Sequence, residues 1–180
     1  MGAKRYSRRR RNKSRRKNRT RRSFRQRGGD LNMGASPITN PTSFDFTAML
    51  EPGMKMGPFG LDAPVEKAQT KPHVYWAAPT AGEMYALICW DPDAPEKSHL
   101  HWLVINCGGK NPESGETLQD WNGPSPPKDQ THRYYFRVFK QNGKITPAPI
   151  NSRIGFNVDQ FAQQNGLTAL ADKVMRVKGV

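Results

Sequence analysis

Short apolar segments separated by proline- and glycine-rich turns are the feature that most restricts the fold of this chain. Three of them, residues 84–90, 102–105 and 134–139, are shorter than a typical helix and rich in aromatic and aliphatic side chains. In residues 132–139 the side chains at even positions share one face of a strand, and those at odd positions share the other. This pattern predicts a mainly β fold, a sandwich of antiparallel sheets with one or two short helices.

Two local predictions follow from turn and capping residues. Residues 74–78 and 83–90 flank Pro79-Thr80-Ala81-Gly82, which favours a hairpin with a four-residue loop. Near the C-terminus, Asn157 is a typical N-cap for a helix over 158–164, and Asn165-Gly166 is a typical left-handed stop.

The basic residues are distributed very unevenly. Residues 1–29 contain 15 of the 29 Lys and Arg residues and no acidic residue, whereas the net charge of residues 30–180 is close to zero. A tract so charged and so poor in apolar side chains cannot bury enough surface to fold. We therefore expect a disordered basic tail at 1–29, a linker at 30–43 and a folded domain at 44–180.

The tail is expected to bind a polyanion by neutralising phosphates, without sequence specificity. Arg outnumbers Lys in it, and guanidinium suits bidentate phosphate contacts, which favours nucleic acid over an anionic membrane. A plain alternative is a solvated polycation that aids nuclear import or solubility. The candidate contact residues are Arg8, Arg9, Arg10, Arg11, Arg15, Arg16, Arg21 and Arg22.

The cysteines and the hydropathy of the chain indicate the cellular compartment that we expect for the protein. Cys89 and Cys107 lie in apolar segments and are expected to be buried free thiols in a reducing compartment, the cytoplasm or the nucleus. No apolar stretch approaches the length of a membrane span, and the basic N-terminus is not followed by a signal-peptide core. A protein packaged with nucleic acid in a virion would account for the tail. The oligomeric state is left open.

Polar side chains occur where the apolar segments meet rigid turns. Asp91 ends the first segment, His101 opens the second, and His132 and Tyr134 open the third. A phosphate group accepts hydrogen bonds at all its oxygens, so imidazole, phenol and backbone N–H donors suit it. Asp91 would then orient a histidine or accept from an ammonium group. We expect one small anion pocket at a sheet edge.

These blocks resemble the phosphatidylethanolamine-binding protein family. The resemblance rests on Asp91-Pro-Asp-Ala-Pro, on His101-Trp-Leu-Val-Ile-Asn, and on Gly123-Pro-x-Pro-Pro followed by His132-Arg-Tyr. It implies a β-sandwich with an anion pocket for phosphate-type head groups or phosphorylated partners, and a binding module rather than an enzyme, with no cofactor. The pocket residues carried over are Asp91, Pro95, His101, Pro126, Pro127, His132 and Tyr134, with Asp93 fixing the turn.

Other interpretations remain beside this one. Two histidines and an aspartate can bind iron or zinc, although the resemblance implies no metal. Ser125 lies in the right turn for a hydrolase nucleophile but has no assigned base. His73 and His99 are expected to be surface or loop residues. A scaffold or interaction protein, in which the tail carries the function, is the alternative to a ligand-binding module.

Overall fold

The computed structural model describes residues 1–2, 35–36, 38, 44–57, 59–77 and 81–180. Nearly all of the predicted basic tail, and most of the predicted linker at 30–43, lie outside these ranges. Within them the chain forms two sheets and two short α-helices, so the predicted mainly β fold is confirmed.

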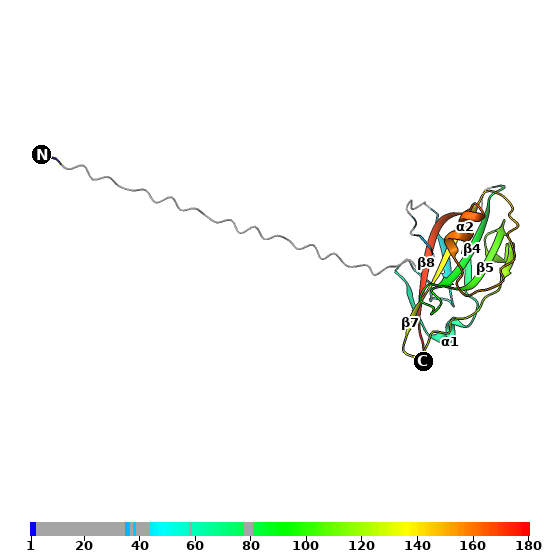
Figure 1. Cartoon of the computed structure of the whole chain (residues 1–180), viewed down its shortest axis with the longest axis horizontal. Coiled ribbons are helices and arrows are strands. Elements are labelled where there is room, and N and C mark those ends of the chain that lie inside the picture. The colour runs from blue at the N-terminus through cyan, green and yellow to red at the C-terminus, as the bar shows by residue number, and fades with distance from the viewer. Residues whose placement is uncertain (3–34, 37, 39–43, 58, 78–80) are drawn as a thin grey trace.

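A six-stranded sheet forms the centre of the domain, and a two-stranded sheet packs against it (Figure 1). The strand order in the large sheet is β2-β8-β7-β4-β5-β6, and β1 pairs with β3 in the small one. The strands are β1 (Phe46–Met49), β2 (Leu61–Ala63), β3 (His73–Trp76), β4 (Met84–Asp91), β5 (His99–Cys107), β6 (Glu116–Gln119), β7 (Thr131–Gln141) and β8 (Thr168–Lys178). The helices are α1 (Val65–Ala68), α2 (Val158–Gln164) and the 3-10 turn η1 (Pro112–Ser114).

The large sheet is covered on both faces, which explains the apolar sequence of its central strand β4. Leu87 and Cys89 enter the core shared with the small sheet, whereas Ile88 and Trp90 enter a second core with α2. A strand that alternates between two cores needs apolar side chains at nearly every position. The predicted alternation of β7 is also confirmed, because its even positions from 134 to 138 lie in the first core.

The predicted hairpin between residues 74–78 and 83–90 is wrong. β3 pairs with β1, and β4 pairs with β5 on one side and β7 on the other. Both edges of β4 are therefore occupied, and no edge is left for β3. Residues 79 and 80 of the expected loop, and residue 78 before it, lie outside the described ranges. The purely antiparallel arrangement also has an exception, because β2 runs parallel to β8.

The predicted C-terminal helix is confirmed together with both of its ends. Asn157 Oδ1 accepts a hydrogen bond from the backbone N–H of Gln160 at 2.9 Å. After α2, Gly166 adopts a positive φ of 62°, and the N–H of Leu167 donates back to the carbonyl of Ala162. Cys89 and Cys107 are free and buried, as predicted, and burial raises the pKa of both thiols.

Candidate functional site

The polar residues of the three motif blocks come together because their strands are neighbours in the large sheet. The order β7-β4-β5 places the start of β7 beside the end of β4, and the end of β4 beside the start of β5. All four side chains are nearly inaccessible: Asp91 is 3% exposed, His101 and His132 are each 4% exposed, and Tyr134 is 1% exposed. Ionisable groups buried this deeply need specific partners.

Asp91 and His132 form a buried pair across the β4–β7 boundary. His132 donates from Nδ1 to Asp91 Oδ2 at 2.7 Å, while the backbone N–H of Asp93 donates to Asp91 Oδ1 at 2.7 Å. His132 Nε2 lies 3.3 Å from Gln130 Oε1. Both ring nitrogens therefore face oxygen acceptors, and the ring can donate from both when it is protonated. Asp91 fixes the orientation of His132 in the way that a carboxylate orients a catalytic or metal-bound imidazole.

The turn after β4 is tied to β7 by a second, partly exposed pair. Arg133 donates from Nε and Nη2 to the two oxygens of Asp93 at 2.8 and 2.5 Å, and its backbone N–H donates to Oδ2 at 2.9 Å. Burial alone would raise the pKa of Asp93, but these bonds and the positive charge of Arg133 outweigh burial and lower that pKa. Asp93 thus joins the turn to the strand that carries His132.

His101 is held from the opposite side of the site. Its Nδ1 hydrogen-bonds to the carbonyl of Asn122, and its own carbonyl accepts from the backbone N–H of Asn122 at 2.9 Å. Arg153 Nη1 also donates to the carbonyl of His101 at 3.1 Å. Burial lowers the pKa of His101 to about 4, so the ring is neutral at pH 7. In the neutral ring Nδ1 carries the proton and donates a hydrogen bond to the Asn122 carbonyl, so Nε2 is an acceptor.

Burial also dominates the ionisation of the other two groups. It raises the pKa of Asp91 despite the opposing effect of His132. Burial, the negative charge of Asp91 and a hydrogen bond to that carboxylate raise the pKa of Tyr134 well above its usual range. Tyr134 therefore keeps its proton and remains a donor at neutral pH, with its ring 5.0 Å from that of His101 in an edge-on arrangement.

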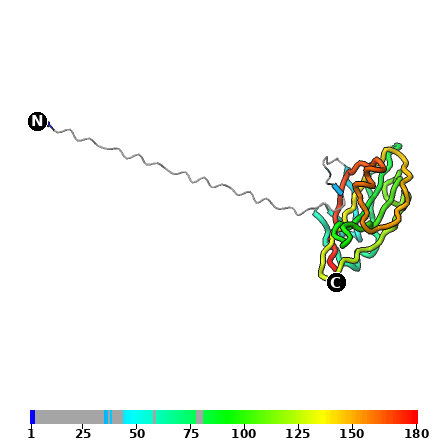
Figure 2. Tube along the Cα trace, in the orientation of Figure 1, coloured from blue at the N-terminus to red at the C-terminus, as the bar shows by residue number. Residues whose placement is uncertain are grey.

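These residues line a cavity of about 250 Å³. Of the three predicted proline walls, Pro95 and Pro127 line it, whereas Pro126 is buried beneath the turn. The C-terminal end of the chain lies beside this turn (Figure 2). The N–H of Gly179 donates to the carbonyl of Gln130, and an added Cβ at Gly179 would overlap the carbonyls of Pro126 and Pro127. Only glycine allows the two backbone segments to approach this closely. The C-terminal segment thereby supports the pocket loop.

The sequence reasoning missed His99, which the structure places in the cavity wall. Its ring centroid lies 4.9 Å from that of His101, and its Nε2 lies 3.3 Å from Asn122 Nδ2. The signal was present, because residues two apart on one strand point to the same face. His73 is exposed on β3, as predicted. Glu96 and Ser125 also line the cavity.

The geometry gives no support to the metal and hydrolase interpretations. Among the described residues, no three His, Cys, Asp or Glu side chains are grouped so that they could share a metal ion. Ser125 lies on the cavity wall, but within the described part of the chain no imidazole hydrogen-bonds to it. The cluster is a set of donors and acceptors around a small space, which suits recognition of a polar head group.

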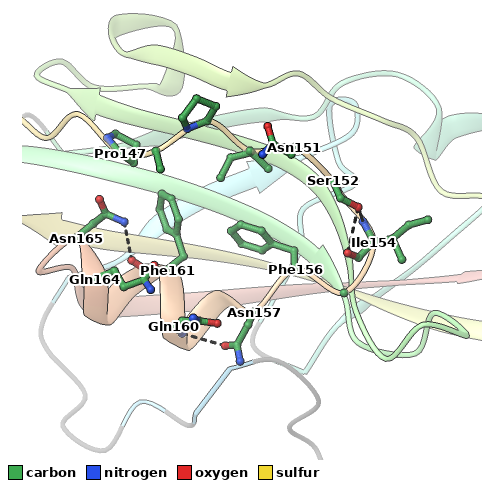
Figure 3. A pocket seen from close by; sticks show the side chains of 14 residues that line it. Pro147, Asn151, Ser152, Ile154, Phe156, Asn157, Gln160, Phe161, Gln164 and Asn165 are labelled. Carbon is green, nitrogen blue, oxygen red and sulfur yellow. Dashed lines mark hydrogen bonds between the residues drawn. The ribbon is translucent and has the colours of Figure 1, made fainter.

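A larger cavity, of about 330 Å³, lies elsewhere, between the loop at 147–155 and α2. Figure 3 shows the loop on one side, Gln160, Gln164 and Asn165 on the other, and Phe156 and Phe161 between them. It is lined by amide and apolar side chains and by Ser152, and no ionisable side chain lines it. Although it is larger, it has none of the imidazole and phenol groups that line the smaller cavity, so the smaller cavity is the better candidate for an anion site.

Comparisons with known proteins agree with this geometry. The family model described as "Phosphatidylethanolamine-binding protein" matches residues 46–176. The chain belongs to the phosphatidylethanolamine-binding protein family. A curated relative of this family member, CEN-like protein 1 of Nicotiana tabacum, is 34% identical over 104 residues, 54% of this chain and 59% of the relative. The matched region thus spans less than two thirds of that relative.

Two solved structures share the fold of this family member. The carboxypeptidase Y inhibitor, solved in complex with its cognate proteinase, aligns with a TM-score of 0.70 and 22% identity, over 78% of this chain and 85% of the inhibitor. A phosphatidylethanolamine-binding protein from Plasmodium vivax aligns with a TM-score of 0.67 and 18% identity, over 84% and 93%. At these identities the similarity establishes the fold. Within the described ranges, no helix has both the length and the apolar character needed to cross a bilayer.

Proposed function

We propose that this protein is a binding module whose 250 Å³ pocket takes a phosphate-type head group without chemical turnover, and that its basic tail tethers it to a polyanion. The single observation that carries the pocket assignment is the buried Asp91–His132 pair, which presents an oriented imidazole at the cavity wall. Membership of the phosphatidylethanolamine-binding protein family supports a ligand of this class.

The donors and acceptors in the pocket suit a head group with both charges. Two groups suit phosphate oxygens. Nε2 of His132 donates when the ring carries a proton on both nitrogens, and the Tyr134 hydroxyl can turn its one proton from Asp91 to the ligand. Neutral His101 offers an acceptor, and Glu96 adds a carboxylate to the wall, which suits an ammonium group. Phosphoethanolamine carries both charges, and a phosphate on a protein side chain presents the anionic half alone.

The expected affinity is weak. Each hydrogen bond that involves a charged group contributes about 1.5–3 kcal/mol. Two or three of these, less the entropy of capturing a small ligand, correspond to a Kd from about micromolar to about millimolar. The proline-bounded loop loses less conformational entropy when the ligand binds, because its φ angles are already restricted in the free protein.

Calorimetric titration with phosphoethanolamine, ethanolamine and inorganic phosphate tests the pocket. We expect phosphoethanolamine to bind most tightly, and His132→Ala to weaken it at least about tenfold, which is about 1.4 kcal/mol. The matched control is His73→Ala, which removes an exposed imidazole from the small sheet and should leave affinity unchanged. Equal affinities for the two variants, both folded by circular dichroism, contradict the site.

The tail proposal rests on the 15 basic residues among residues 1–29. Binding of fluorescent duplex DNA should weaken steeply with salt, with log K falling by about 0.9 per phosphate contact for each unit of log salt. Replacing Arg8, Arg9, Arg10 and Arg11 by Gln should reduce this slope, and deleting residues 1–29 should abolish binding. DNA binding that survives the deletion with the same slope contradicts the tail assignment.

The scaffold alternative predicts a different pair of results. If phosphoethanolamine and phosphate both fail to bind the full chain and the chain without residues 1–29, the pocket function fails while the tail function stands. Proteinase inhibition belongs to the carboxypeptidase Y inhibitor, and the low identity to that protein carries no inhibitory residue over to this chain.

A further inference from the structure

The segment that joins the basic tail to the domain is anchored on α2 by one serine. The backbone N–H of Ser36 donates to Asp159 Oδ1 at 2.8 Å, and its hydroxyl donates to Asp159 Oδ2 at 2.6 Å. The preceding Ala35 is 2% exposed and belongs to the second core. Ser36 itself is exposed. This anchor lies more than a hundred residues from α2 in sequence and outside the ligand pocket.

A buried arginine completes the anchor from the sheet. Arg137 on β7 donates from Nη1 to the carbonyl of Ser36 at 2.8 Å. Its other donors, Nε and Nη2, are committed to Asp172 on β8 at 2.6 and 2.7 Å, and its guanidinium lies over the ring of Trp90. The charge of Arg137 is thus already balanced by Asp172, and it is not free to neutralise a second anion.

The Ser36 hydroxyl is therefore in contact with a negatively charged group. The group that contacts the hydroxyl is the carboxylate of Asp159, and among the described residues no cation forms an ion pair with that carboxylate. A hydroxyl donates to this carboxylate, but a phosphate in its place has no proton to donate and carries nearly two negative charges. Phosphate placed beside an aspartate disrupts the contact by repulsion.

The sequence places this hydroxyl in a context that a kinase can read. Ser36 precedes Pro37, the Ser-Pro dipeptide that proline-directed protein kinases modify. The chain has two other dipeptides of this kind, at Ser125 and Thr146. Ser125 lies between two prolines on the wall of the ligand pocket. Ser36 differs from both because its hydroxyl holds two parts of the protein together.

We propose that Ser36 is a phosphorylation site for a proline-directed kinase, and that phosphate at Ser36 releases the Ala35–Ser36 anchor from α2. In the modification, the bond between the γ-phosphorus of ATP and its bridging oxygen breaks, and ADP leaves. A bond forms between that phosphorus and Ser36 Oγ, and the hydroxyl proton passes to a base of the kinase. Local opening of the anchor exposes the hydroxyl to the kinase, and the phosphate then prevents the anchor from closing.

Release changes the reach of the basic tail. About ten residues separate Ser36 from Phe46 at the start of β1. Phe44 already packs against the first core, so the released segment runs from Ser36 to Phe44. Each residue of an extended chain spans at most about 3.5 Å, so after release Ser36 can lie up to about 28 Å from Phe44. The anchor thus determines where the polycation leaves the domain, independently of any ligand in the pocket.

The test uses the full chain, treated with a proline-directed kinase and ATP, and measures solvent exchange of the Ser36 amide by NMR. We expect a phosphate on Ser36 and an amide exchange rate at least tenfold faster than in the unmodified protein. Ser36→Asp should also accelerate exchange of the amide at position 36, whereas Ser43→Asp, the same change elsewhere in this segment, should not. Ser36→Ala should show a smaller increase, because the backbone bond to Asp159 remains.

A charge-reversal variant separates repulsion from simple loss of a hydrogen bond. Because Asp159→Lys removes the acceptor of the Ser36 amide, its readout is the NMR shift of the Ala35 methyl group, which is buried in the second core while the anchor is closed. In the phosphorylated Asp159→Lys chain this methyl should keep its buried shift, because the lysine attracts the phosphate that the carboxylate repels. The proposal is overturned if Ser36 is not the modified residue, if phosphorylation of the wild-type chain leaves exchange of the Ser36 amide unchanged, or if the Ala35 methyl is released in the phosphorylated Asp159→Lys chain as fully as in the phosphorylated wild type. Because these measurements need no pocket ligand, they stand or fall separately from the proposed function.

Discussion

His132 donates a hydrogen bond from Nδ1 to Asp91 Oδ2 at 2.7 Å, with both side chains 5% exposed, and this pair joins the start of β7 to the end of β4. The two residues are 41 positions apart in sequence. If either side chain is removed, the other stays buried without a hydrogen-bond partner. The pair therefore couples the two strands at the pocket.

A double-mutant cycle should measure this dependence. Asp91→Ala is expected to lower the free energy of unfolding by about 3–5 kcal/mol, because it leaves a buried imidazole without its acceptor. With His132→Ala as the second variant, chemical denaturation should give a coupling energy of about 1–3 kcal/mol. The control pair is Lys67–Glu51, at 2.9 Å but with side chains 49% and 42% exposed, where coupling below about 1 kcal/mol is expected. Equal coupling in the two pairs contradicts the assignment.

Stability should fall on mild acidification because of His101. Its folded-state pKa is about 4 and its ordinary value is 6.5, so the unfolded state binds more protons between these two pH values. The free energy of unfolding therefore decreases as pH falls from 6.5 towards 4, by about 3 kcal/mol from this group. Asp91, with a raised pKa, acts in the opposite direction at the acidic end of the window.

Urea unfolding at several pH values checks this effect. His101→Gln removes the titrating group and keeps a side chain that can hydrogen-bond, so its stability should depend less on pH than that of the wild type. A variant whose unfolding free energy retains the full slope between pH 6.5 and 4 shows that other groups cause it.

Gly179→Ala should displace the pocket loop that contains Pro126 and Pro127. An added Cβ would overlap the carbonyl oxygens of Pro126 and Pro127, which cannot move without shifting the pocket loop. We expect a loss of about 1–3 kcal/mol in stability and weaker phosphoethanolamine binding. Gly108→Ala is the control, because no atom lies within 4 Å of its added Cβ. Unchanged melting temperature and affinity in Gly179→Ala would show that the C-terminus does not support this loop.

Arg133→Lys should weaken the turn after β4 while keeping the charge. Lysine cannot reproduce the two-pronged contact with Asp93, so we expect stability to fall by about 1 kcal/mol and phosphoethanolamine affinity to fall with it. Arg176→Lys is the matched control, since Arg176 lies opposite Arg133 on β8 and makes the same kind of contact with Asp62, and neither Arg176 nor Asp62 lines the pocket. Its affinity should equal that of the wild type. Equal losses of affinity in both variants would contradict a role for the Asp93–Arg133 contact in the pocket.

Much of the candidate site could be predicted from local sequence. Asp91, His101, His132 and Tyr134 each lie at a strand end, where a period-two pattern meets prolines, and the helix at 158–164 is bounded by its own capping residues. Pairing of distant strands is not encoded in this way. The expected hairpin failed because the turn residues at 79–82 do not reveal that β5 and β7 occupy both edges of β4.

The sequence by itself determined a mainly β domain, the uneven distribution of charge and the residue types available for an anion site. These follow from side-chain period, backbone restriction by proline and counts of charge, all of which are local properties. Tertiary structure decided that Asp91 orients His132, that His99 belongs to the cavity, and that Ser36 docks on Asp159 beside Arg137. Those relationships depend on burial and on contacts between residues distant in the chain, which are settled only when the whole sheet is assembled.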